Sequence, residues 1–313
     1  MKRFLELIST QSLQWLMVAL LSIVLTLTSC TPSEQIPPKP ECIFDDSPNP
    51  RLVCFNETPQ RIISLAPSNT EILFALGLGD KVMGVTDWCD YPSEALEKEK
   101  IGGPWTPDVE KILALQSDLI LASDANPFDI ITTLEGLELT VFGIKTTDLY
   151  DLLDDIRTVG EITDTEVQAQ ALTAEMSTGI KAVTNQTEYL AQRPKVFYIL
   201  GHEPSLWTAG SGTFIHELIE KAGGMNICQN ITSYAEITLE YVLARDPEII
   251  ITSKYSYDWA INSTDLAATN ASQSERIYQC DDNLVQRPGP RLVEGLEWFA
   301  HFIQPEIFEE PED

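Results

Sequence analysis

Histidine is scarce in this 313-residue chain, which has only His202, His216 and His301. A transition-metal site normally gathers several imidazoles and carboxylates around one ion, so this scarcity argues against a dedicated metal centre. The chain also has no G-x-S-x-G elbow, no phosphate-binding loop, no H-E-x-x-H and no C-x-x-C. The main sequence signatures of catalysis are therefore missing, and we expect no enzymatic activity and no catalytic cofactor.

Basic residues are also few: 20 lysines and arginines stand against 48 aspartates and glutamates, for a formal net charge of −28. A chain without a basic face cannot release counterions from phosphate, which excludes nucleic acid as a partner. The acidic residues are spread along the chain, as expected of a solvated surface. An apolar content of 43% predicts a globular protein, and a length of 313 residues allows one large or two ordinary domains.

The amino end has the composition of an export signal. Two basic residues precede an apolar run from Leu13 to Leu27, and small residues then lead to Cys30. This pattern resembles the signal of bacterial lipoproteins, in which the cysteine is lipidated and becomes the new first residue. We expect a signal peptide over residues 1–29, a lipid anchor on Cys30 at the cell envelope, and a Pro-rich tether over residues 30–41. The alternative is a retained signal anchor, because the apolar run is nearly long enough to span a bilayer.

Export makes disulfides possible for the five cysteines that remain. Cys42 and Cys54 lie on either side of a DDSPNP turn, so a hairpin would place them opposite each other and predicts a disulfide. Cys228 and Cys280 belong to the same half of the chain and form a second candidate pair. Cys89 is then left as a free thiol.

One short pattern occurs twice. Residues 108–121 read DVEKILALQSDLIL, and residues 238–251, offset by 130, read TLEYVLARDPEIII. Each copy begins with a helix-capping residue, carries a glutamate two positions later (Glu110 and Glu240) and ends in an apolar strand. The helix dipole alone explains one such glutamate, but two at equivalent positions can dock on paired basic sites of a partner.

Strands alternate with helices along most of the chain, which predicts an α/β fold with mainly parallel sheets. We expect an N-terminal lobe over residues 42–160 and a C-terminal lobe over residues 193–306, followed by an acidic tail over residues 307–313. Residues 161–192 contain almost no Gly or Pro and roughly keep helical spacing. They predict one long helix that joins the lobes, about 30 residues and about 45 Å in length.

Aromatic residues gather in loops after predicted strands, where ligands of open α/β sheets bind. Large flat side chains from both lobes can stack on a large, partly apolar ligand in a cleft between them. The residues of this kind are Trp88, Tyr91, Trp105, Trp207, Tyr234 and Trp259.

Several sequence blocks closely resemble the cobalamin/iron-compound branch of ABC-transporter substrate-binding proteins. They include RIISLAPSNTEILFALGLGDKVMGVTDWCDYP, GGPWTPDVEKILALQSDLIL, GSGTFIHELIEKAGGMNI and RPGPRLVEGLEWFA, which recur in order across residues 42–306. The resemblance implies two Rossmann-like lobes bridged by one long helix. It also implies a monomer with a cleft that binds a corrinoid, haem or a ferric siderophore and delivers it to a membrane permease and its ATPase. Glu110 and Glu240 match the two glutamates with which this family meets permease arginines.

The D-Y-P motif that contains Tyr91 looks most like the cobalamin binders, so the resemblance implies cobalamin as the ligand. The matching contact positions are Trp88, Trp105, Trp207 and Tyr234, with Asn69 at the cleft floor and Arg287 facing the cleft on a looser match. Haem binders supply an axial Tyr or His, and Tyr91 and His202 keep that alternative open. Siderophore binders often use basic residues, of which this acidic chain has few.

Two other classes of protein remain as alternatives. A lipid-anchored enzyme or redox protein would use Cys89 near the cleft, but it needs a base beside the thiol, and no histidine lies nearby in the sequence. A sensor would bind the same ligand and signal to a kinase. A receptor with a rigid linking helix is expected to close by only small movements of its lobes.

Overall fold

The structure, a computed structural model, describes residues 41–45 and 50–309. The expected signal peptide, the lipid anchor on Cys30 and nearly all of the tether lie outside the described residues. In the part of the chain that is described, no helix is both long and apolar enough to cross a bilayer.

The N-terminal lobe is built on a five-stranded parallel sheet. Strands β3, β8 and β9 are buried along their whole length, as is usual when helices cover both faces. The strands, in order across the sheet, are β5 (Glu99–Lys100), β4 (Val82–Val85), β3 (Ile62–Ser64), β8 (Leu119–Ser123) and β9 (Val141–Ile144). The helices are α2 (Pro67–Ala75), α3 (Val109–Ala114), α4 (Phe128–Gly136) and α5 (Leu149–Thr163), with two 3₁₀ turns, η1 (Gly79–Lys81) and η2 (Ser93–Glu97).

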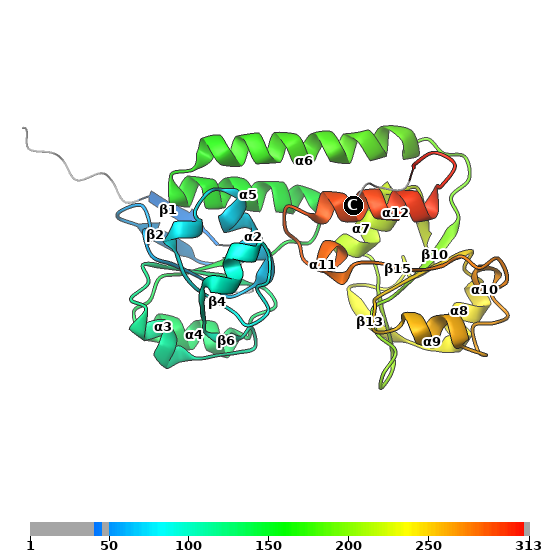
Figure 1. The fold of residues 1–313 in the computed structure, drawn as a ribbon, viewed down its shortest axis with the longest axis horizontal. Coiled ribbons are helices and arrows are strands. Elements are labelled where there is room, and N and C mark those ends of the chain that lie inside the picture. Colours follow the sequence, from blue (N-terminus) through cyan, green and yellow to red (C-terminus); the bar gives the residue numbers. More distant parts are fainter. Residues whose placement is uncertain (1–40, 46–49, 310–313) are drawn as a thin grey trace, which may run out of the picture. The chain divides into compact units, whose positions relative to one another are not determined.

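The C-terminal lobe is built on a four-stranded parallel sheet (Figure 1). Its strands, in order, are β12 (Met225–Asn226), β10 (Lys195–Ile199), β14 (Ile249–Thr252) and β15 (Ile277–Gln279). Its helices are α7 (Phe214–Lys221), α8 (Leu239–Arg245), α9 (Tyr257–Asn262), α10 (Asn270–Gln273), α11 (Asp282–Val285) and α12 (Leu292–Ile303). Three antiparallel ribbons complete the fold: β1 (Glu41–Phe44) with β2 (Leu52–Phe55), β6 (Gly102–Gly103) with β7 (Thr106–Pro107), and β11 (Leu206–Ala209) with β13 (Tyr234–Ile237). The prediction of an α/β fold with two lobes and mainly parallel sheets is confirmed.

The repeated sequence pattern forms α3 followed by β8 in one lobe and α8 followed by β14 in the other. The capping residues act as their type predicts, because the side chain of Asp108 accepts from the amide of Lys111 and that of Thr238 from the amide of Tyr241. The repeat therefore marks the same helix–strand unit in each lobe.

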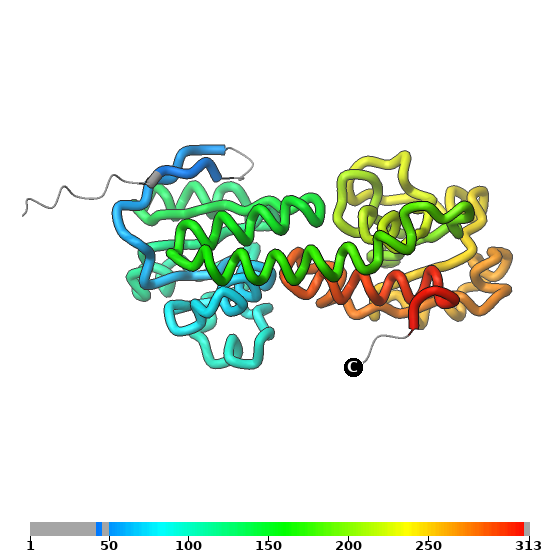
Figure 2. The backbone as a smooth tube through the Cα atoms, turned by 90° about the horizontal axis from the view of Figure 1, so that it is seen from above, coloured from blue at the N-terminus to red at the C-terminus, as the bar shows by residue number. Residues whose placement is uncertain are grey.

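The helix that joins the lobes is shorter than expected. It is α6, which has 22 residues over Glu166–Thr187, and it runs along both lobes (Figure 2). Residues 161–163 belong to α5, which ends where Asp164 adopts a left-handed conformation with φ of 60°. A short polar residue tolerates that conformation at a helix C-terminus, so the chain turns there and α6 starts anew.

The disulfide between Cys42 and Cys54 is confirmed, and it links directly opposed residues of β1 and β2. The prediction of a second disulfide between Cys228 and Cys280 is wrong, because both are free, buried thiols. Cys228 packs with residues on one face of the C-terminal sheet and Cys280 with residues on the other face. Side chains on opposite faces of a sheet cannot meet, so two cysteines of the same lobe need not be close enough to form a disulfide.

Gly160 of α5 and Gly136 of α4 provide a matched test of how closely α6 packs. A Cβ at Gly160 would lie 2.5 Å from Cβ of Ala169 in α6, whereas one at Gly136 would meet nothing within 4 Å. We expect Gly160→Ala to lower the unfolding free energy by about 1–3 kcal/mol through overpacking. Gly136→Ala should be neutral or raise it by up to about 1 kcal/mol through helix propensity. Urea unfolding measures both, and equal effects would contradict the close contact.

Candidate functional site

A cleft of about 900 Å³ lies between the two lobes and is lined by both. Segments that follow β3, β4, β8 and β9 line one side, and segments that follow β10 and β14 line the other. These segments begin at the carboxyl ends of parallel strands, where open α/β sheets place their ligands. The volume is near the upper end of the range of about 300–1,000 Å³ seen in small-molecule sites, so the cleft suits a large ligand.

Aromatic rings face the cleft from both lobes. Trp88 and Trp105 are each about half exposed and meet edge to face, with ring centroids 4.6 Å apart. Tyr234 lies on the opposite wall and contacts Phe214 edge to face at 6.4 Å. Burial, with a smaller contribution from Asp124, raises the pKa of the Tyr234 phenol, which therefore stays protonated at neutral pH. The cleft has flat apolar surfaces on which a large ring system can stack.

Charged residues of the cleft lining occur in equal numbers of the two signs. The acids are Asp90, Asp124 and Asp282, and the bases are Lys145, Lys254 and Arg287. Burial raises the pKa of Asp124, and the charge of Lys145 partly offsets this rise. Burial also raises the pKa of Asp282, and the backbone hydrogen bond and the charge of Lys254 partly offset that rise. The hydrogen bond from Arg287 lowers the pKa of Asp90. The charges of the cleft lining thus balance in number, and one base, Arg287, forms an ion pair with a cleft acid, Asp90.

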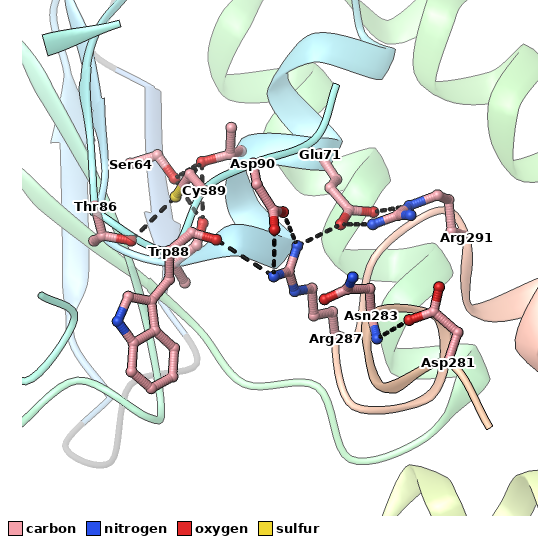
Figure 3. A network of polar contacts seen from close by, with 12 residues as sticks. Ser64, Glu71, Thr86, Trp88, Cys89, Asp90, Asp281, Asn283, Arg287 and Arg291 are labelled. Carbon is pink, nitrogen blue, oxygen red and sulfur yellow. Dashed lines mark hydrogen bonds and ion pairs between the residues drawn. The ribbon is translucent and has the colours of Figure 1, made fainter. Parts of the chain in front are cut away.

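Four charged residues join the lobes at the base of the cleft, and we call them the interlobe ion-pair cluster (Figure 3). Arg291 donates to both carboxylate oxygens of Glu71, at 2.6 and 3.0 Å. Arg287 reaches Asp90 at 2.5 Å and Glu71 at 3.7 Å. Burial raises the pKa of Glu71, and its bonds to Arg291 offset the rise only in part. The two acids belong to the N-terminal lobe and the two bases to the C-terminal lobe.

A second cavity, of about 870 Å³, lies behind this cluster between α2, α6 and the start of α12, and we call it the rear cavity. Glu71 and Arg291 line the rear cavity, whereas Asp90 and Arg287 line the cleft. The cluster therefore separates the two spaces.

Four of the eight predicted ligand residues line the cleft, and the other four do not. Those in the lining are Trp88, Trp105, Tyr234 and Arg287. Asn69 is buried beneath the floor, where its amide donates to the Leu121 carbonyl at 3.1 Å. Trp207 lies on β11 and donates from its indole to Ser205 at 3.0 Å. Both side chains are engaged in these hydrogen bonds, and neither residue is part of the cleft lining.

The two predicted axial ligands for haem also lie outside the cleft lining. The ring of Tyr91 is 3.8 Å from the Arg291 guanidinium and lines the rear cavity. His202 stacks on Trp259 with ring centroids 5.0 Å apart and bonds Ser256 through Nδ1 at 3.0 Å. Within residues 41–45 and 50–309, no three His, Cys, Asp or Glu side chains are grouped so as to hold a metal ion.

The sequence interpretation missed several charged and aromatic residues that line the cleft. Asp124, Lys145 and Lys254 each follow the end of a parallel strand by one or two positions, and Tyr255 follows Lys254. This position after a strand was the signal that could have identified them.

Among the described residues, the thiol of Cys89 bonds two threonine hydroxyls and no imidazole or carboxylate, and Lys100 donates to the Cys89 backbone carbonyl at 2.8 Å. The Sγ of Cys89 lies 3.1 Å from the hydroxyls of both Thr70 and Thr86. Burial raises the pKa of Cys89, so the thiol stays protonated and unreactive at neutral pH.

Glu110 and Glu240 are both exposed in the first turns of their helices. Hydrogen bonds from its own amide and from Thr238 lower the pKa of Glu240. Figure 1 shows α3 and α8 on the side of the two lobes opposite α6. The two helices that carry these glutamates in their first turns therefore lie on one side of the protein, one helix on each lobe.

Comparison with known proteins gives a consistent result. Residues 62–284 match the sequence profile of a family described as periplasmic binding protein. The chain is 32% identical over 274 residues to YvrC, an uncharacterized ABC transporter substrate-binding lipoprotein of Bacillus subtilis (strain 168), covering 85% of this chain and 87% of that protein. The structure of the periplasmic vitamin B12-binding protein BtuF of Vibrio cholerae is similar, with a TM-score of 0.71, 30% identity, and coverage of 79% of this chain and 97% of that one. The periplasmic haem-binding protein HutB of Vibrio cholerae has a TM-score of 0.70 and 26% identity, covering 79% of this chain and 99% of that one.

The buried carboxyl groups predict that mild acid stabilises the protein. Burial raises the pKa of Glu217, Asp282 and Glu297. The folded state therefore binds more protons than the unfolded state, and the unfolding free energy should increase as pH falls from about 7.5 to about 5. Asp90 has a lowered pKa, so its contribution to the unfolding free energy is lost only when the pH falls below the ordinary pKa of aspartate, outside this range.

Urea unfolding at several pH values measures this dependence. Glu297→Gln removes one of the proton-binding groups and should make the pH dependence less steep. A lower unfolding free energy at about pH 5 than at about pH 7.5 would show that these carboxyl groups do not govern stability in that range.

Proposed function

Because this chain belongs to the periplasmic binding protein family, whose members bind solutes and are not enzymes, we propose that it captures a corrinoid, cobalamin, for an ABC importer. The ligand would be held in the cleft between the lobes and delivered to the permease and ATPase. Support for this ligand comes from the vitamin B12-binding protein of Vibrio cholerae, which is 30% identical over 262 residues, covering 82% of this chain and 93% of that protein.

The equal number of acids and bases in the cleft lining is the observation that favours cobalamin most. Cobalamin carries many neutral amide groups and a large ring system, whereas haem carries two carboxylates and ferric siderophores are often anionic. A cleft lining in which three acids balance Lys145, Lys254 and Arg287 offers no surplus positive charge to an anion. Trp88 and Trp105 add a stacking surface, and the amide groups of the ligand can bond the polar lining.

Haem is the second candidate, and one observation supports it. Tyr255 is 77% exposed at the edge of the cleft, and Tyr234 lies on its wall, so a tyrosine can reach an iron in the cleft. The haem-binding protein HutB supports the same candidate. Tyr91 and His202, the two residues that the sequence suggested for this role, do not line the cleft.

The protein would act outside the cytoplasmic membrane, tethered by a lipid on Cys30, as the amino-terminal sequence and the lipoprotein YvrC suggest. We propose that it works as a monomer. Its acidic helix tips, Glu110 on α3 and Glu240 on α8, would meet arginines of the permease. A sensor that binds the same ligand is the competing role.

Cyanocobalamin should quench the tryptophan fluorescence of the purified protein in a saturable way. Trp88→Ala removes a stacking surface of the cleft and should weaken binding by roughly tenfold or more, equal to about 1.4 kcal/mol. Trp298→Phe, on α12 away from the cleft, is the control and should leave affinity unchanged.

Haem provides the competing ligand in the same assay. Tight haem binding without cyanocobalamin binding would overturn the corrinoid assignment, and loss of that binding in Tyr255→Phe would identify the iron ligand. Binding of neither ligand would leave the family assignment intact and remove both candidates.

Reversing the charge of both helix tips should abolish uptake without changing ligand affinity. The double variant Glu110→Lys/Glu240→Lys loses the docking charges but alters no residue of the cleft lining. Glu166→Lys/Glu188→Lys, at the two ends of α6 on the opposite side, is the matched control and should transport normally. Cellular uptake of radiolabelled cobalamin measures transport, and normal uptake by the first variant would mean that the tips do not dock.

A further inference from the structure

Glu71 is a buried carboxylate on α2 that contacts the C-terminal lobe but is not part of the cleft lining. Its side chain is only 2% exposed and accepts two hydrogen bonds from Arg291. Arg287 lies 3.7 Å from the same carboxylate. Two guanidinium groups of one lobe therefore share one carboxylate of the other.

Arg287 connects Glu71 to the wall of the cleft. Its guanidinium contacts Asp90 at 2.5 Å and donates to the backbone carbonyl of Trp88 at 3.3 Å (Figure 3). The ring of Trp88 in turn meets Trp105 on the cleft surface. A series of contacts thus runs from Glu71, through Arg287, to the backbone that carries a cleft tryptophan.

The backbone between the two arginines approaches Glu71 closely. A Cβ on Gly289 would lie 3.2 Å from Oε2 of Glu71 and 3.5 Å from its Cβ, so glycine leaves room for this approach. Pro288 and Pro290 flank that glycine and restrict the φ angles of the segment. The segment Arg287–Arg291 is therefore held in a shape that presents both arginines to the N-terminal lobe.

Charge balance explains why the contact of Glu71 with the two arginines affects the cleft. The interlobe ion-pair cluster holds two carboxylates and two guanidinium groups, and burial makes an unpaired charge there costly. A neutral residue at position 71 would leave Asp90 alone to balance both arginines. The arginines would then turn toward water, and the lobes would move apart at the base of the cleft.

We propose that Glu71 is a positioning residue for ligand binding, which holds the Trp88 loop at a set distance from the C-terminal lobe through Arg287 and Arg291. Sites whose supporting contacts are loosened lose affinity even when every lining atom is kept. The affinity test rests on the proposed corrinoid function, whereas the distance between the lobes can be measured without any ligand.

The first measurement is the affinity of Glu71→Gln for cyanocobalamin, which should fall by roughly tenfold or more although the cleft lining is unchanged. Glu297→Gln is the matched control, since Glu297 lines the same rear cavity and forms no ion pair among the described residues; its affinity should equal that of the wild type. Arg291→Lys keeps the charge but loses the two-point bond, so it should weaken binding by a smaller factor. Arg291→Lys also serves if Glu71→Gln fails to fold.

The second measurement is the distance between spin labels on Thr133→Cys of α4 and Ala267→Cys of the C-terminal lobe. Both positions are exposed, and the native Cys89, Cys228 and Cys280 are buried, so the labels attach at the introduced sites. Glu71→Gln should lengthen or broaden the distance distribution, and Glu297→Gln should not. A role in stability alone would lower the melting temperature and leave this distribution unchanged.

The proposal would be overturned if folded Glu71→Gln and Arg291→Lys both kept the affinity and the distance distribution of the wild type. Failure of the wild type to bind cyanocobalamin would instead remove the ligand assignment, and the distance measurement would still test the positioning role.

Discussion

The packing of α6 against both lobes is the constraint on which the cleft depends. Gly160 of α5 lets α6 approach at Ala169, and Gly179 of α6 lets Val293 of α12 approach, since a Cβ at either glycine would lie 2.5 Å from its neighbour. One hydrophobic cluster runs from the N-terminal sheet through these helices to the C-terminal sheet. Because side chains in such a core are close-packed, the lobes are held by a shared core as well as by a linker, and the cleft is preformed.

This arrangement also decides what the cleft can bind. Both parallel sheets end at the cleft, so the residues after their strands, including Asp124, Lys145 and Lys254, become its polar lining. The acids and bases of this lining are equal in number, which leaves no surplus positive charge for an anion. The proposed corrinoid would then depend mainly on stacking and shape for its affinity.

Much of the fold follows from local sequence patterns. The repeat that contains Glu110 and Glu240 predicted one helix–strand unit in each lobe, because capping residues and apolar strands act locally. Cys42 and Cys54 were paired correctly, since a hairpin sets its register near its own turn. The pairing of Cys228 with Cys280 was wrong, because membership of one lobe does not say which face of a sheet a side chain occupies.

The sequence by itself determined the two α/β lobes, the aromatic residues near the strand ends and the acidic helix tips. Only the tertiary structure decided which of these residues meet: Trp88, Trp105, Tyr234 and Arg287 line the cleft, whereas Asn69 and Trp207 form hydrogen bonds outside the cleft lining. The pairing of Glu71 with Arg291, across 220 positions of sequence, was likewise invisible in any local pattern. Contacts of this kind depend on how the two lobes pack against each other, and that packing is set by the whole core.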